Sequence, residues 1–211
     1  MAIKSLYIDR IFSKIRNILY QKLLWRYAFG NRVSRSIWEK QFSSGVWDYL
    51  YSDKEKQHYQ IITSYVEHYG STPSLLDIGC GQGVLYHYIK ENSNLVKYSG
   101  IDISKQAIEI GKKDFPEANF YQADFDREKL NGKFDIVVFN ETLYYFKRPL
   151  KTIENVIKYN LNANGHIIIS MCDYIGHDVI WQKLEKRYTP LKKDVVENQV
   201  GQKWKITIFK P

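Results

Sequence analysis

The feature that most constrains the fold is a glycine-rich segment, Leu75-Leu76-Asp77-Ile78-Gly79-Cys80-Gly81-Gln82-Gly83, between a short apolar run and a helical pattern. Glycines at such a junction allow positive φ angles and a close approach of ligand atoms to the main chain, although glycine turns also occur for packing alone. The carboxylate of Asp77 just before the turn favours a ligand with a cationic amine and disfavours a dinucleotide pyrophosphate. The segment predicts a strand, turn and helix at a ligand site.

Short apolar runs alternate with helical patterns from this point onward. The expected strands lie near residues 74–79, 96–103, 119–125, 134–140, 166–171, 194–200 and 203–209, and the expected helices near 84–90, 105–113, 150–159 and 178–188. Strands that alternate with helices are typical of a parallel sheet covered on both faces. The last two strands are joined through Gly201-Gln202 and predict an antiparallel hairpin that closes the sheet. The fold class is therefore α/β.

The residues before the sheet predict helices. Apolar residues between positions 8 and 23 follow helical spacing up to Gly30, and a second helix is expected over about 34–42. Ser52-Asp53-Lys54-Glu55 has the Ser-x-x-Glu form of a capping box, which predicts the start of a third helix that ends at Gly70. We expect a helical extension over residues 1–70 and a ligand-binding domain over 71–211.

Positive charge is concentrated at the N-terminus. The first 40 residues hold nine Lys and Arg against two acidic residues, a balance of +7 out of the chain's +8. A basic amphipathic helix with Trp25 and Tyr27 near its end fits a lid over a pocket, a contact with an anionic membrane surface, or nucleic acid. The lid is the favoured interpretation, and nucleic acid is the least favoured.

The chain shows no long apolar run and no signal-peptide cleavage pattern, which predicts a cytoplasmic protein, with contact at the inner membrane face as the alternative. Cys80 and Cys172 lie within apolar runs and predict two reduced thiols. Because His and Cys residues lack close ligand spacing, no metal site is expected. Four histidines are expected to be structural, since each lies in an ordinary helix or strand pattern: His58, His68, His87 and His166.

Carboxylates also lie at the ends of the second and third predicted strands. Asp102 comes 25 positions after Asp77 and is placed to accept hydrogen bonds from ribose hydroxyls. Asp124 beside Phe125 can accept a hydrogen bond from an adenine amino group while the ring packs on the base. Asp102 could instead cap the helix that begins near Ser104, and Asp124 could cap a turn. Because open α/β sheets bind ligands at the carboxyl ends of their strands, we favour one shared site.

These motifs together resemble the class I S-adenosylmethionine-dependent methyltransferases, through LLDIGCGQG, GIDIS, ADF, FDIVVFNETLYYF and NGHIIIS over about residues 74–211. The resemblance implies a seven-stranded Rossmann-like sheet, mostly parallel with the last strand antiparallel, and S-adenosylmethionine as the cofactor. It also implies these roles: Gly79, Cys80 and Gly81 around the methionine portion, Asp77 near its amino group, Asp102 on the ribose, Ile103, Asp124 and Phe125 around the adenine, and Asn140 with Glu141 below the sulfonium.

A narrower resemblance extends upstream. The motifs Glu39-x-x-Phe42-x-x-Gly45-x-Trp47-Asp48-Tyr49-Leu50, Asn140-Glu141-x-Leu143-Tyr144-Tyr145-Phe146 and Trp204-x-Ile206 are similar to small-molecule methyltransferases of bacterial polysaccharide and glycoconjugate pathways. They are also similar to nodulation-type methyltransferases that act on a sugar amine. This resemblance implies a small-molecule acceptor, a sugar or a sugar-linked compound, with Trp47 and Tyr144 in contact with it.

An acceptor hydroxyl must lose its proton, and Glu141, Tyr145 or His177 could receive it at the ligand-binding edge. In the alternative interpretation Glu141 only shapes the cofactor site, the tyrosines pack in the core, and His177 begins a helix.

Other classes fit less well. An NAD-dependent oxidoreductase would share Asp102 but is disfavoured by Asp77 and the terminal hairpin. Nucleic-acid amino-methyltransferases carry a Pro-Pro-aromatic run where this chain has Asn140-Glu141-Thr142-Leu143, and the second glutamate of protein arginine methyltransferases is not found. The remaining alternatives are a methyltransferase of a non-sugar metabolite and a membrane- or RNA-binding protein built on the same scaffold.

Overall fold

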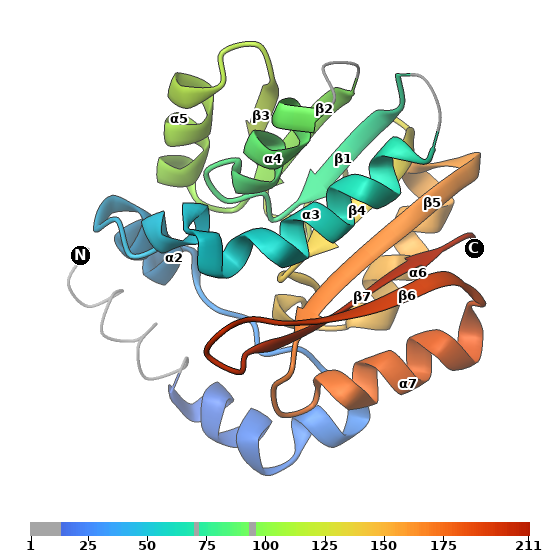
Figure 1. The fold of residues 1–211 in the computed structure, drawn as a ribbon. Helices are drawn as coiled ribbons and strands as arrows, with labels where there is room; N and C mark the ends of the chain where they lie inside the picture. Colours follow the sequence, from blue (N-terminus) through green and yellow to red (C-terminus); the bar gives the residue numbers. More distant parts are fainter. Residues whose placement is uncertain (1–13, 70–71, 93–95) are drawn as a thin grey trace.

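A computed structural model of the chain describes residues 14–69, 72–92 and 96–211, shown in Figure 1. The strands are β1 (Ser74–Ile78), β2 (Lys97–Asp102), β3 (Asn119–Gln122), β4 (Phe134–Asn140), β5 (Leu161–Cys172), β6 (Pro190–Glu197) and β7 (Lys203–Phe209). The helices are η1 (Leu24–Tyr27), α2 (Arg35–Ser43), η2 (Asp48–Tyr51), α3 (Asp53–Glu67), α4 (Val84–Asn92), α5 (Lys105–Asp114), η3 (Leu143–Tyr145), α6 (Pro149–Tyr159) and α7 (His177–Arg187). Residues 14–22 are also helical.

The seven strands form one sheet in the order β3-β2-β1-β4-β5-β7-β6. The pairings from β3 through β5 are parallel, whereas β7 runs antiparallel to both β5 and β6. This confirms the predicted sheet. Because β1 lies between β2 and β4, the strand order reverses direction there, and ligands bind at such a point, outside the carboxyl ends of the strands.

Both faces of the sheet are covered, which explains the continuous apolar runs of its central strands. On one face Leu75 and Val138 pack in a core with residues of α3, α4 and α5. On the other face Leu76 and Val137 pack with residues of α6 and α7. The burial of both faces fixes the strand ends in a rigid frame.

The N-terminal extension has two parts that lie in different places. Helical residues 14–22 lead into η1, which packs against α7 (Figure 1), and the buried Tyr20 hydroxyl donates to the carbonyl of Ile175 at 3.0 Å. In the second part, α2 lies against the N-terminus of α5, where the Glu39 carboxylate accepts hydrogen bonds from the main-chain N–H groups of Lys105 and Gln106 at 2.8 and 2.9 Å. These donors have no partner within α5. Residues 1–13, which include part of the expected first helix, lie outside the described residues.

Two local predictions differ from the structure. Ser52 precedes α3 as expected, but its side chain makes no capping hydrogen bond, and Glu55 instead lines a cavity. The helix ends at Glu67 rather than Gly70. The β6–β7 connection is longer than Gly201-Gln202, because Asn198 Oδ1 accepts hydrogen bonds from the main-chain N–H groups of Val200 and Gln202 and so closes a five-residue loop.

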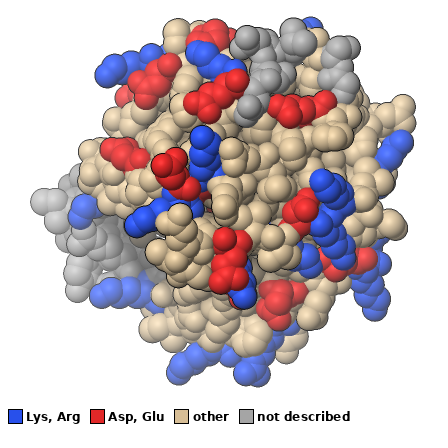
Figure 2. All heavy atoms as spheres, viewed as in Figure 1, with Lys and Arg blue, Asp and Glu red and all other residues tan. Residues whose placement is uncertain are grey.

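On the face seen in Figure 2, Lys and Arg side chains are interspersed with Asp and Glu. Nucleic-acid binding is typically marked by basic side chains gathered on one face. Within residues 14–69, 72–92 and 96–211, no helix combines the length and apolar character needed to cross a membrane.

Candidate active site

A cavity of about 410 Å³ lies at the carboxyl ends of the central strands, a size typical of small-molecule sites. Thirteen of the fourteen predicted site residues line it: Trp47, Asp77, Gly79, Cys80, Gly81, Asp102, Ile103, Asp124, Phe125, Asn140, Glu141, Tyr144 and Tyr145. The N-terminal extension contributes the opposite wall, from Arg32 to Tyr59. None of the helical residues 14–22 lines the cavity, so within the described residues the wall that we call the lid comes from the second part of the extension.

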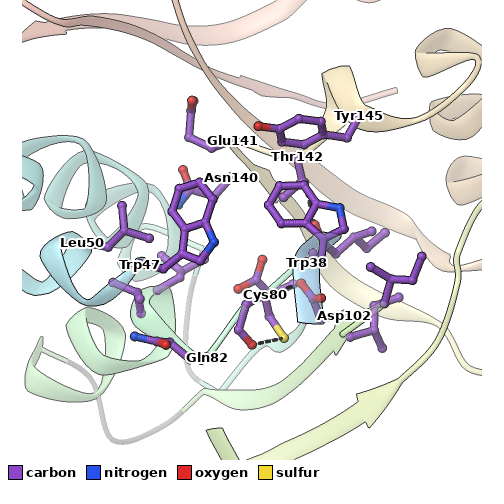
Figure 3. Close-up of a pocket in the computed structure, with 18 of the residues that line it drawn as sticks. Trp38, Trp47, Leu50, Cys80, Gln82, Asp102, Asn140, Glu141, Thr142 and Tyr145 are labelled. Carbon is purple, nitrogen blue, oxygen red and sulfur yellow. Dashed lines mark hydrogen bonds between the residues drawn. The ribbon is translucent and has the colours of Figure 1, made fainter. Parts of the chain in front are cut away.

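The cavity has two ends, which Figure 3 shows on either side of Trp38 and Trp47. We call the first the turn end, which comprises Asp77, the turn from Gly79 to Gly81, Asp102, Ile103 and Asp124. We call the second the tyrosine end, which comprises Glu55, His58, Glu141, Tyr144, Tyr145 and Cys172.

The glycine turn adopts the positive φ angles that its sequence predicts, +79° at Gly79 and +55° at Gly81. A Cβ atom on Gly79 would overlap the side chain of Thr142, and one on Gly81 would lie 3.3 Å from the ring of Phe42. Glycine is therefore required at this turn for conformation and for packing against other lining residues. Close approach of a ligand to the same main chain stays a prediction.

Asp102 connects the turn to α5. Its Oδ2 accepts a hydrogen bond from the Gly81 N–H at 3.0 Å, and its Oδ1 accepts one from the Ser104 N–H at 2.8 Å. Burial raises the pKa of Asp102 to about 6, and these two hydrogen bonds oppose that rise. The helix-start role and a ligand role are compatible, because each carboxylate oxygen has a second lone pair.

Asp77 is fully buried on β1 and is only partly satisfied. Its Oδ2 accepts a hydrogen bond from the Tyr98 hydroxyl at 2.8 Å, whereas its Oδ1 has no hydrogen-bond partner. Burial raises the pKa of Asp77 to about 7; the Tyr98 hydrogen bond opposes this rise and the nearby Asp102 adds to it. A buried acceptor without a donor is costly, so this oxygen suits a cationic group of a ligand.

Asp124 has a partner that the sequence did not suggest. Arg32, from the N-terminal extension, pairs with Asp124 Oδ2 and also with Asp126 at 2.6 Å. The main-chain N–H of Asp126 donates to Asp124 Oδ1 at 3.3 Å, which fits the turn-capping alternative. Arg32 therefore engages one of the two Asp124 carboxylate oxygens, and contact of Asp124 with an adenine amino group stays a prediction.

Glu141 is held in an unusual backbone conformation at the end of β4. Its φ is +56°, which is uncommon for a residue with a side chain and often marks a functional position. Its Oε2 accepts a hydrogen bond from the Tyr144 hydroxyl at 3.1 Å, and its Oε1 is buried without a hydrogen-bond partner. Burial raises the pKa of Glu141 to about 7; hydrogen bonds from Cys172 and Tyr144 oppose this rise, and Glu55 adds to it.

His177 does not line the cavity, which corrects its assignment as a possible proton acceptor. It begins α7, its ring stacks on Tyr144 with centroids 4.1 Å apart, and its Nδ1 lies 2.6 Å from the Cys172 carbonyl oxygen. Because the ring is buried behind Tyr144, His177 supports that side chain and has no access to an acceptor.

His58 lines the cavity, although its sequence context indicated a structural role. The ring is 1% exposed and stacks on Trp204 at 4.7 Å, and neither ring nitrogen has a hydrogen-bond partner. Burial lowers its pKa to about 3, and Glu55 Oε2 lies 4.0 Å from Nδ1. The available signal was the helical spacing of residues 55, 58, 59 and 62, which places them on one face of α3.

Both cysteines are free thiols, and both line the cavity. Burial raises the pKa of Cys80 well above its usual value, which keeps this thiol neutral. Within the described parts of the chain, no group of three or more His, Cys, Asp or Glu side chains is arranged to hold a metal ion.

The methyltransferase domain family matches residues 71–208 of this chain. The malonyl-[acyl-carrier protein] O-methyltransferase of Halalkalibacterium halodurans is 30% identical over 104 residues, which is 46% of this chain and 38% of that protein. The enzyme of the same name from Acetivibrio thermocellus is 28% identical over 132 residues, 62% of this chain and 46% of that protein. The chain thus spans less than half the length of these two relatives.

Solved structures show the same fold. The N-methyltransferase NodS of Bradyrhizobium japonicum WM9, solved with S-adenosyl-L-homocysteine, superposes with a TM-score of 0.71 at 16% identity, over 83% of this chain and 97% of that one. Magnesium protoporphyrin IX methyltransferase of Synechocystis PCC 6803, solved with bound S-adenosylmethionine, gives 0.64 at 17% identity, over 83% and 96%. The chain therefore belongs to the methyltransferase domain family, within the class I methyltransferases that use S-adenosylmethionine.

Proposed function

We propose that the chain binds S-adenosylmethionine at the turn end and transfers its methyl group to a hydroxyl or amino group of a small-molecule acceptor at the tyrosine end. The observation that carries the proposal is a cavity in which carboxylates from the ends of β1, β2 and β4 face side chains of the N-terminal extension. We propose a sugar or a sugar-linked compound as the acceptor.

The residues of the turn end fit the cofactor. Asp77 Oδ1, buried and without a donor, suits the cationic amino group of the methionine portion. The carboxylate of Asp102 suits the ribose hydroxyls, and Ile103, Phe125 and Asp124 suit the adenine. Asn140 Oδ1, also buried without a partner, would lie below the sulfonium. These assignments follow the family motifs residue by residue.

S-adenosylmethionine supplies an electrophilic methyl group on a good leaving group. The protein's own contribution is to place the acceptor atom in line with that carbon and to exclude water. Glu141 lies at the acceptor side of the cavity with one free carboxylate oxygen, and it would receive the acceptor's proton. His177 and Tyr144 would hold that carboxylate in position through their stacked contact.

Aromatic and polar groups together support a sugar acceptor. The rings of Trp38 and Trp47 lie 5.8 Å apart and can pack on the apolar face of a sugar ring. Asn140 and Glu141 offer buried oxygens to its hydroxyls. A non-sugar acceptor is the competing proposal, because the curated relatives are named for a malonyl-[acyl-carrier protein].

We also propose that helical residues 14–22 touch an anionic membrane surface. Apolar side chains at positions 15, 18, 19 and 23 are each about half exposed, and Lys14, Lys22 and Arg26 lie among them. Exposed apolar side chains flanked by basic ones are typical of helices that lie in the membrane interface. This contact would place the enzyme near lipid-linked acceptors. A scaffold that binds membrane or RNA without catalysis is the alternative.

Two measurements test the proposal. Isothermal titration should show binding of S-adenosylhomocysteine, and a screen with nucleotide sugars, lipid-linked sugars, amino sugars and malonyl thioesters should give a product 14 mass units heavier. Transfer only to malonyl thioesters would overturn the sugar acceptor. Absence of S-adenosylhomocysteine binding would overturn the methyltransferase activity itself and favour the non-catalytic scaffold.

A further inference from the structure

We propose that the group methylated by this enzyme is an amine, which enters as an ammonium ion between the Glu141 carboxylate and the aromatic wall formed by Trp38, Trp47, Tyr49 and Tyr145. This inference rests on the proposed function and narrows it, because it excludes a carboxylate acceptor and disfavours a hydroxyl.

The charges of the cavity are the first argument. Glu55 and Glu141 bring two carboxylates to the tyrosine end. Among the described lining residues Arg32 is the single Lys or Arg, and its guanidinium is paired with Asp124 and Asp126 at the turn end. A carboxylate acceptor would therefore meet like charge without a counterion, whereas an ammonium ion would find opposite charge.

The aromatic wall is the second argument. Trp38 lies 5.8 Å from Trp47 and 5.0 Å from Tyr145, and Trp47 lies 6.1 Å from Tyr49, measured between ring centroids. Figure 3 shows the two tryptophans facing the space below Glu141 and Tyr145. The faces of such rings attract cations, most strongly where water is excluded. Aromatic side chains hold quaternary ammonium ligands in this way.

Unpartnered acceptors are the third argument. Glu141 Oε1 is buried without a hydrogen-bond partner, and so are both ring nitrogens of His58, a side chain that is 1% exposed. A neutral imidazole has one acceptor nitrogen, and an ammonium ion has three N–H donors. An ammonium group therefore supplies the donor that Glu141 Oε1 lacks, whereas a carboxylate supplies none.

The proton balance also favours an amine. The ammonium gives one proton to the Glu141 carboxylate, and the neutral amine then forms a bond from nitrogen to the donor methyl carbon while the carbon–sulfur bond breaks. The products are a methylammonium ion, S-adenosylhomocysteine and a protonated Glu141, which releases its proton to water. Because burial raises the pKa of Glu141 to about 7, this carboxylate matches an amine with a pKa of about 8. A hydroxyl, whose pKa resembles that of water at about 16, is poorly matched.

The test uses the full chain saturated with S-adenosylhomocysteine and three probes of matched size: benzylamine, benzyl alcohol and phenylacetate. Isothermal titration at pH 7.5 should show benzylamine binding about tenfold or more tightly than benzyl alcohol, and phenylacetate binding more weakly still. Glu141→Gln should abolish the advantage of benzylamine over benzyl alcohol. The matched control Glu109→Gln removes an exposed carboxylate on α5 and should preserve it. Thermal unfolding of each variant verifies its folding.

Three results would overturn the amine assignment: phenylacetate binding as tightly as benzylamine, an unchanged preference in Glu141→Gln, or no binding of any probe. Failure of S-adenosylhomocysteine to bind is a separate result, because it contradicts the proposed function before any acceptor probe is added. In the screen described above, methyl transfer to hydroxyls at rates equal to those of amines would also contradict the assignment.

Discussion

The two ends of the cavity are built in different ways. At the turn end, the glycine turn and the three aspartates lie at the carboxyl ends of neighbouring strands, and the oxygens of Asp102 accept hydrogen bonds from main-chain N–H groups. At the tyrosine end, α3, η3, β5 and the residue after β4 each contribute side chains, and Glu141 Oε1 and both ring nitrogens of His58 lack hydrogen-bond partners. A site made from strand ends is specified by a local motif. A site made from separate segments is specified only by the tertiary fold. Such a site can therefore accept different methyl acceptors in relatives that share one methyl donor.

The largest expected effect is a loss of catalytic rate, caused by a substitution at the tyrosine end alone. Glu141→Gln should lower kcat for the accepted substrate by about 10²- to 10⁴-fold, because the proton acceptor is lost. The affinity for S-adenosylhomocysteine should change by no more than about threefold. Steady-state kinetics with mass-spectrometric detection measures the rate, and kcat within about threefold of wild type would remove Glu141 from the mechanism.

The next effect concerns the link between the lid and the turn end. Arg32→Ala should lower the free energy of unfolding by about 3 kcal/mol, because it leaves the buried carboxylates of Asp124 and Asp126 without their main partner. For a chain of this size the melting temperature should fall by about 6–12 °C in calorimetry. Arg127→Ala is the matched control: its side chain is 68% exposed and lies 3.6 Å from Asp124. Such a surface pair contributes about 0–1 kcal/mol. Equal losses in the two variants would contradict the proposed bridge.

A pH series probes the turn end with a smaller effect. Because burial raises the pKa of Asp77 to about 7, this carboxyl is increasingly protonated as the pH falls below 7. A cationic amino group requires the ionised form, so the affinity for S-adenosylhomocysteine should weaken about tenfold from pH 8 to pH 6. The stability of the unliganded protein should change in the opposite direction to the affinity. Because the pKa of Asp77 is higher in the folded than in the unfolded state, ionisation of Asp77 lowers the free energy of unfolding as the pH rises between about 4 and 7. The Asp77→Asn variant should bind S-adenosylhomocysteine more weakly than wild type and should lose most of the pH dependence of the affinity. If the affinity of the variant changes with pH as much as that of wild type, another group is responsible for the pH dependence.

The smallest effect concerns the first part of the extension, which lies outside both ends of the cavity. The full chain should sediment with phosphatidylglycerol vesicles about two- to fivefold more than with phosphatidylcholine vesicles. Ile18→Gln combined with Leu23→Gln should abolish the difference, while Val195→Gln, an exposed apolar residue on β6, should not. If wild type stays in the supernatant with both lipids, the membrane contact is refuted.

The sheet was predictable because its central strands are buried on both faces and appear as apolar runs, separated by segments with helical spacing. The turn end was predictable for a related reason: Asp77, Asp102 and Asp124 each lie at or just beyond the carboxyl end of a strand, and the parallel sheet brings these strand ends together.

The tyrosine end was predictable only in part. Glu141, Tyr144 and Tyr145 follow a strand, but His58 and Glu55 reach the cavity through the placement of α3 on the sheet, which no local pattern encodes. The pairing of Arg32 with Asp124 joins residues 92 positions apart, so the local sequence around either residue does not predict it. His177 follows β5 at the ligand-binding edge of the sheet, but its ring stacks on Tyr144 and does not line the cavity.

Titration of S-adenosylhomocysteine into Asp102→Ala and Glu141→Gln tests most directly whether the two ends act separately. Loss of the Asp102 carboxylate removes charge-assisted hydrogen bonds to two ribose hydroxyls, so affinity should fall about 100-fold or more, while Glu141→Gln should stay within about threefold of wild type. Asp102→Asn, which keeps the shape of the side chain and one acceptor oxygen for the turn, should also bind clearly more weakly. Undiminished affinity in both Asp102 variants, or equal losses in Asp102→Ala and Glu141→Gln, would contradict a donor site at the turn end that is separate from an acceptor site at the tyrosine end.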